Sequence, residues 1–144
     1  MTLTQILKTL VTCILVISFL LVTVSAYQQH RTLSELAELS DATSSIATRL
    51  SVDELAYVDN GGKLHMYTLD PSKLEGLSAQ WEIGGENFEF QVSVRYEAGG
   101  ERVLGPYGSI PPEGKARCSF TVANALYEND RFLPAKLSVI VWRT

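Results

Sequence analysis

The chain has 144 residues, a formal net charge of −4 at neutral pH and two cysteines, and its pI is near 5.1. This acidic balance argues against nucleic-acid binding, for which a basic patch is the expected feature. Cys13 lies in an apolar run and Cys118 in the distal half, so the two cysteines do not predict a disulfide scaffold.

The N-terminal part of the chain is dominated by an uncharged apolar run, Thr9–Tyr27. A run of about nineteen residues is long enough to cross a bilayer as one α-helix. Lys8 and the free N-terminal amine precede the run, and these positive charges favour an N-terminus in the cytoplasm. All sixteen acidic residues follow Ser34 and would then lie outside. We therefore expect a single-pass membrane protein, with a short cytoplasmic segment at residues 1–8, a transmembrane helix at residues 9–27, and the remainder extracytoplasmic at the cell surface.

A cleaved signal peptide is the alternative interpretation of the same run. Val24-Ser25-Ala26 is a small-residue pattern of the kind that signal peptidase accepts. The apolar run is longer than the roughly 7–15 residues of the apolar region in a typical signal peptide, and the helical pattern continues past the possible cleavage point. We therefore expect residues 1–26 to be retained as an anchor, and secretion after cleavage is the alternative.

Residues 28–52 contain no glycine or proline and carry apolar side chains at spacings of three and four, which predicts an amphipathic helix or stalk. Because no breaker separates this segment from the apolar run, one helix is expected from about residue 3 to residue 51. Its apolar stripe is expected to pack on the chain's own distal domain, on helices of neighbouring copies, or on each at different heights along the helix. Four residues of this stripe are predicted to mediate helix packing and assembly: Leu33, Leu36, Leu39 and Ile46.

From residue 53 onwards apolar and polar residues alternate, which is typical of β-strands. Asn60-Gly61 between two such runs indicates a hairpin, while the prolines and glycines of Gly105–Gly114 predict a surface loop. Residues 53–144 are therefore predicted to form an antiparallel sheet or small sandwich of about six strands, which makes the chain α+β. Strands are expected at Leu55–Asp59, Leu64–Leu69, Phe88–Tyr96, Ala116–Ala123 and Leu137–Trp142, with Pro134 where the last one begins.

This layout, an N-terminal membrane helix that continues as an amphipathic helix into a small β-domain, resembles the architecture of type IV pilins and pseudopilins. The closing segment Leu133–Trp142 is similar to that of archaeal pilin-like and TadE-like membrane proteins. The resemblance implies a structural or assembly component that packs laterally with other copies or with related pilin-like subunits. Prepilins carry a glycine or alanine directly before the apolar helix, whereas Lys8 is followed by Thr9. This departure implies an uncleaved relative or an accessory protein instead of a major pilin.

Side chains suited to catalysis or metal binding are few and scattered. His30 is expected where the helix leaves the membrane, His65 lies in a predicted strand, and neither has a second histidine or cysteine nearby. Cys118 alternates with Phe120 and Val122 and is expected to be a buried core thiol. We therefore predict no enzyme activity, no catalytic, cofactor or metal site, and no nucleic-acid or small-molecule ligand.

Two functions remain open at this stage. The first is a pilin-like structural or assembly component that is held in the lipid bilayer by its N-terminal helix. The second is a secreted or anchored β-sandwich that binds a partner and does not self-assemble. Self-association through the helix stripe would favour the first function, and a monomer with a binding surface on the β-domain would favour the second.

Overall fold

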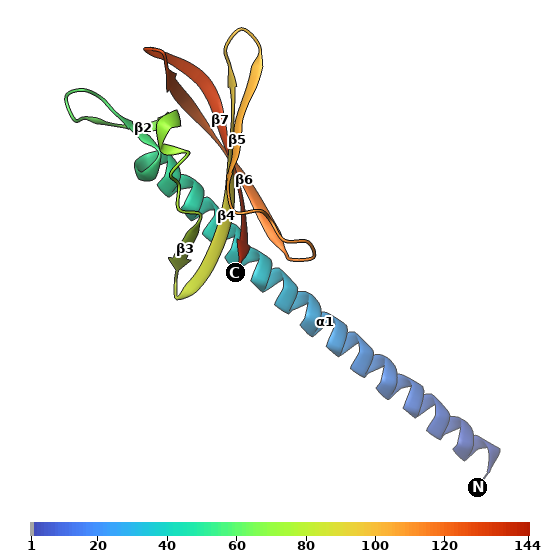
Figure 1. The fold of residues 1–144 in the computed structure, drawn as a ribbon. Coiled ribbons are helices and arrows are strands. Elements are labelled where there is room, and N and C mark those ends of the chain that lie inside the picture. Colours follow the sequence, from blue (N-terminus) through green and yellow to red (C-terminus); the bar gives the residue numbers. More distant parts are fainter. Residues whose placement is uncertain (1) are drawn as a thin grey trace. The chain divides into compact units, whose positions relative to one another are not determined.

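A computed structural model describes residues 2–144, and Met1, which belongs to the predicted cytoplasmic segment 1–8, lies outside the described residues. The chain begins with one long helix, α1 (Leu3–Arg49), which passes directly into a π-helical turn at Leu50–Glu54 (Figure 1). No glycine or proline occurs before Gly61, so nothing interrupts the helix. The single helix expected from residue 3 to residue 51 is therefore confirmed.

The chain divides into two compact units, Met1–Ala37 and Glu38–Thr144. In the first unit, the described residues form the N-terminal part of α1 and their side chains are all exposed. The second unit contains the C-terminal part of α1, the π-helical turn and a sheet of seven strands. The α+β class is therefore confirmed.

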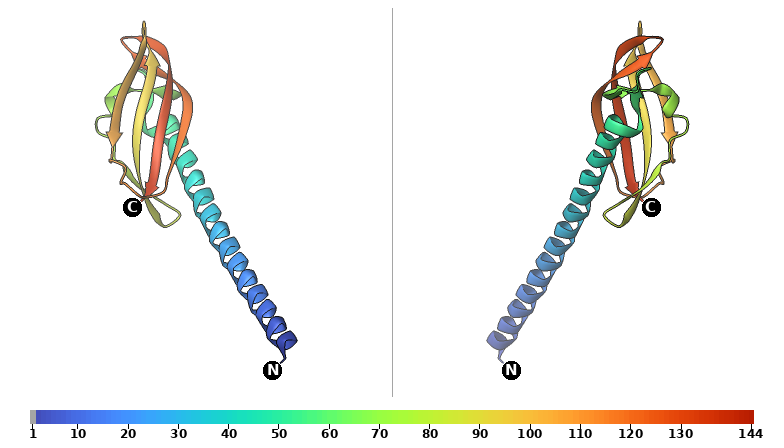
Figure 2. Two further views of the ribbon diagram at one scale, coloured as in Figure 1. Left: turned by 90° about the vertical axis from the view of Figure 1, so that its right-hand side faces the viewer. Right: turned by 90° about the vertical axis from the view of Figure 1, so that its left-hand side faces the viewer.

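The sheet has the strand order β1-β2-β6-β7-β4-β3, and β5 also pairs with β4 (Figures 1 and 2). It is mixed, whereas an antiparallel sheet was predicted, because β2 and β6 run parallel over two residue pairs, Thr68 with Ala125 and Leu69 with Leu126. Local turn patterns indicate which strands form hairpins, but they do not indicate the edge or direction in which a hairpin joins the sheet. The strands are β1 (Ala56–Val58), β2 (Leu64–Leu69), β3 (Gln80–Ile83), β4 (Glu86–Glu97), β5 (Glu101–Gly108), β6 (Arg117–Glu128) and β7 (Arg131–Arg143), and a 3-10 turn lies at Pro71–Lys73.

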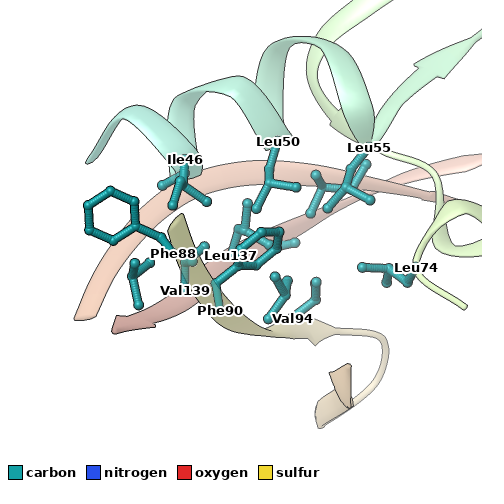
Figure 3. Close-up of a cluster of buried hydrophobic side chains, with 14 of the residues drawn as sticks. Ile46, Leu50, Leu55, Leu74, Phe88, Phe90, Val94, Leu137 and Val139 are labelled. Carbon is teal, nitrogen blue, oxygen red and sulfur yellow. The ribbon is translucent and has the colours of Figure 1, made fainter. Parts of the chain in front are cut away.

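The core of the second unit lies between the C-terminal part of α1 and one face of β4 and β7 (Figure 3). Alternate residues of β4 from Phe88 to Tyr96 are buried, as their pattern predicts. The last strand is a core strand, since β7 lies between β6 and β4 and Leu137, Val139 and Val141 are fully buried. From the helix, Leu39, Ala42, Ile46 and Leu50 complete this core.

Two features of the sheet differ from the prediction. Residues Gly105–Gly108 belong to β5 and not to a loop, because an edge strand tolerates proline and the register against β4 shifts between Val92 and Val94. Gly108 has a φ of +99°, and a Cβ there would come within 2.6 Å of the Phe90 carbonyl oxygen, so only glycine fits. Pro134 lies inside β7, at a point where β7 has β6 but not yet β4 as a neighbour.

The inner face of β6 is covered less than the sequence predicts. Cys118, Phe120 and Val122 share one face, as expected, but Phe120 is 42 % exposed and Cys118 is only partly buried. The buried sheet residues come mainly from β4 and β7, with Leu126 as the buried apolar residue of β6. Cys118 packs against the core, as expected, but it is only partly buried, because one helix is too narrow to cover every strand.

Candidate functional site

The apolar part of α1 is suited to a hydrocarbon environment. It contains a stretch of 18 residues with a mean hydropathy of 2.5, and no residue of this stretch is buried. Its threonine hydroxyls donate to carbonyl oxygens one turn earlier: Thr9 to Gln5 at 2.9 Å, Thr12 to Lys8 at 2.8 Å and Thr23 to Phe19 at 2.8 Å. These polar groups are therefore satisfied within the helix, as lipid requires. The helix is long and apolar enough to cross a membrane, and an N-terminal signal sequence has the same properties.

The four residues predicted to mediate helix packing and assembly fall into two groups. Leu33 and Leu36 are 59 % and 43 % exposed, whereas Leu39 and Ile46 are 3 % and 0 % exposed. Leu39 and Ile46 belong to the core of the Glu38–Thr144 unit, so their own sheet already covers them. Of these four residues, Leu33 and Leu36 are the two that present apolar surface that a second protein can cover.

Arg143, near the C-terminus, forms two ion pairs at the beginning of the Glu38–Thr144 unit. Arg143 Nη2 lies 2.6 Å from Glu38 Oε2 on α1 and 3.0 Å from Glu86 Oε2 at the start of β4. Because Glu38 and Arg143 are 105 residues apart, no local pattern in the sequence points to this contact. The three residues join the helix, the β3–β4 turn and the last strand at one place.

His65 forms part of the β1–β2 hairpin, where it lies beside Asp59. Its Nε2 lies 3.1 Å from Asp59 Oδ2, and the other Asp59 oxygen accepts the backbone N–H groups of Gly61 and Lys63, each at 2.9 Å. The N–H of Lys63 and the bond to His65 lower the pKa of Asp59 below its ordinary value. Among residues 2–144, no three His, Cys, Asp or Glu side chains are grouped in a way that could hold a metal ion.

This histidine belongs to an aromatic cluster that the sequence analysis did not predict. It consists of Tyr57, His65, Tyr127 and Phe132, from β1, β2, β6 and β7. The rings of Tyr57 and Tyr127 stack with centroids 3.9 Å apart. Hydrogen bonds with Tyr57 and Asp130 raise the pKa of the Tyr127 hydroxyl. Phe132 is 58 % exposed, so the cluster reaches the surface.

A comparison of the chain with protein-family models, with curated proteins and with solved structures finds no match. The likeness to pilins therefore rests on layout alone. A long apolar helix at the N-terminus followed by a mixed β-sheet is consistent with a pilin-like architecture.

Proposed function

We propose that the protein is a pilin-like structural or assembly component, anchored in the bilayer by residues 9–27 with its N-terminus in the cytoplasm. In this proposal the β-domain lies outside the membrane, and the helix packs laterally with other copies or with related pilin-like subunits. The observation that supports it is the change in exposure along one stripe. Leu39 and Ile46 are buried by the chain's own sheet, whereas Leu33 and Leu36 are 59 % and 43 % exposed.

Exposed leucines at helical spacing are suited to packing against another helix. Residues three and four apart lie on one face, and such side chains fit between those of a neighbouring helix. A transmembrane helix needs no such leucines beyond the end of its apolar run. The polar side chains of Ser34 and Glu35 lie beside them, and Glu35 pairs with Arg31 at 3.1 Å, so apolar surface is confined to one side.

The test compares two variants that introduce the same negative charge. One places it on the apolar side of the helix and the other on the polar side. Leu36→Glu places a carboxylate in the proposed contact, while Ser34→Glu places it about half a turn away on the polar side. Crosslinking in native membranes should give multimers larger than a dimer for the wild type and for Ser34→Glu, and no species larger than a dimer for Leu36→Glu with a folded β-domain. The absence of such multimers in all three proteins would contradict the proposal.

A second candidate function is a β-domain that binds a partner without self-assembly, whether secreted or anchored. It is favoured by the large apolar side chains that the β1–β2 hairpin exposes, among them Val58 at 42 %, Leu64 at 38 % and Met66 at 60 %. Exposed apolar surface of this kind is typical of protein-binding sites. Neither candidate function involves catalysis, a cofactor or a nucleic acid.

A further inference from the structure

Four charged side chains lie in two adjacent rows on the outer face of the sheet, the face opposite α1. Glu97 on β4 is directly opposite Glu101 on β5. Two residues earlier on β4, Arg95 is directly opposite Lys136 on β7. Because side chains two residues apart on a strand point to the same face, the four form one patch with an acidic row beside a basic row. We call it the charged patch.

Each row is unfavourable within a single chain, because like charges directly opposite each other destabilise a sheet. One ion pair crosses between the rows, and it is long: Arg95 Nη1 lies 3.7 Å from Glu101 Oε1. These two side chains are 65 % and 70 % exposed. Within residues 2–144, Glu97 and Lys136 form no ion pair.

The surroundings of the charged patch allow another protein to approach closely. The patch lines a hollow of about 420 Å³, which also includes Pro134 and Ala135. The next row of the same face carries only small side chains, Ser93, Ser138 and Thr121. Because these side chains are short, they do not keep a flat partner surface away from the patch.

We propose that the charged patch is a two-fold interface with a second copy of this chain. A two-fold axis that runs diagonally across the strands, between the acidic row and the basic row, brings Glu97 and Glu101 of each copy opposite the partner copy's arginine and lysine at positions 95 and 136. The acidic row of each copy then faces the basic row of the other. An interface in which the same patch serves both copies needs this kind of self-complementarity.

A second copy fits the patch better than other partners do. A purely acidic or purely basic partner would match one row and be repelled by the other. A partner with two rows of opposite order is needed, and the chain itself carries that arrangement. This interface uses the outer face of the β-domain and does not depend on Leu33 and Leu36, so the proposal stands or falls separately from lateral packing of the helices.

The test uses the full-length chain in a mild nonionic detergent, with Leu36→Glu as background so that helix packing does not contribute. Two variants each carry one sign of charge: Arg95→Glu with Lys136→Glu is acidic, and Glu97→Lys with Glu101→Lys is basic. Light scattering should find the background protein dimeric at low salt. Each variant alone should associate at least about tenfold more weakly. An equal mixture of the two should recover the dimer as a heterodimer.

Arg117→Glu is the matched control, because Arg117 is exposed and starts β6 at the other end of the sheet, opposite Trp142. It should leave the dimer unchanged, whereas high salt should dissociate it. Carbodiimide coupling of a mixture of ¹⁴N and ¹⁵N protein provides a readout without any substitution in the patch. It should yield mixed-isotope peptide pairs that join Lys136 to Glu97 or Glu101. A monomeric background protein, or an acidic variant that still forms homodimers, would overturn the proposal.

Discussion

The parts of α1 before and after residue 38 carry the same apolar stripe in different surroundings. Leu33 and Leu36 are about half exposed, whereas Leu39 and Ile46 are buried against the sheet. The periodicity of apolar residues therefore indicates that a face needs covering, but it does not indicate what covers it. After residue 38 the chain's own β-domain does so, and before residue 38 a neighbouring subunit and, for residues 9–27, lipid are the partners that we propose.

The largest loss of stability is expected when part of the sheet that covers α1 after residue 38 is removed. Deleting residues 137–144 takes away most of β7, the strand between β4 and β6. Each buried apolar side chain contributes roughly 1.5–3 kcal/mol, and the three of Leu137, Val139 and Val141 together rival the roughly 5–15 kcal/mol of a whole domain. Circular dichroism and limited proteolysis should show an unfolded β-domain. A protease-resistant β-domain after this deletion would mean that β7 is peripheral.

A pair of alanine variants compares the two parts of the stripe directly. Ile46→Ala should reduce the free energy of unfolding by roughly 2–5 kcal/mol, because it leaves a cavity in the core. Leu36→Ala should change it by no more than about 0.5 kcal/mol, because its side chain is not part of that core. Urea unfolding of the detergent-solubilised chain measures both values. Equal losses for the two variants would show that the division at residue 38 is not real.

A smaller effect is expected at the boundary between the two parts. Arg143→Gln removes the positive charge that Glu38 and Glu86 share. Because the side chains of these acids are 62 % and 48 % exposed, the loss of stability should be about 1 kcal/mol or less. Hydrogen exchange of the backbone amides near Glu38 should become faster while the sheet keeps its protection. Arg117→Gln should leave these amides unchanged, because Arg117 forms no ion pair within residues 2–144.

The smallest effect is expected on the stability of the β1–β2 hairpin as the pH is lowered. The pKa of Asp59 is lowered in the folded chain from an ordinary value of 3.8. Its stabilising contribution is therefore fully present above pH 3.8 and is lost as the pH falls through the lower, folded value. Asp59→Asn should remove this acid-dependent step from the stability of the hairpin, as followed by NMR signals of Gly61 and Lys63. A titration of Asp59 at or above its ordinary pKa would contradict this account of the turn.

Much of the fold follows from patterns that are local in the sequence. The alternation from Phe88 to Tyr96 predicts the buried face of β4, and Asn60-Gly61 predicts the first hairpin. The four residues of β3 are too short a run to show a period, although Trp81 and Ile83 both pack against the core. Gly105–Gly108 has the composition of a loop and becomes a strand only because β4 offers it a partner.

The candidate sites depend on contacts between distant residues, which explains why the sequence predicts them poorly. The stripe from Leu33 to Ile46 could be recognised by its spacing, but its division at residue 38 depends on where the sheet lies. The charged patch depends on the register between β4 and its two neighbours, which places Lys136 opposite Arg95 and Glu101 opposite Glu97. No pattern within one strand contains that information.

The most direct test of the account is the intact mass of the protein isolated from its native membrane. If the N-terminal part of α1 is a retained anchor, the mass will include residues 2–26 and the protein will require detergent for extraction. An N-terminus at Tyr27 would contradict the retained anchor, because the chain would have been cut after Val24-Ser25-Ala26 and released from the membrane.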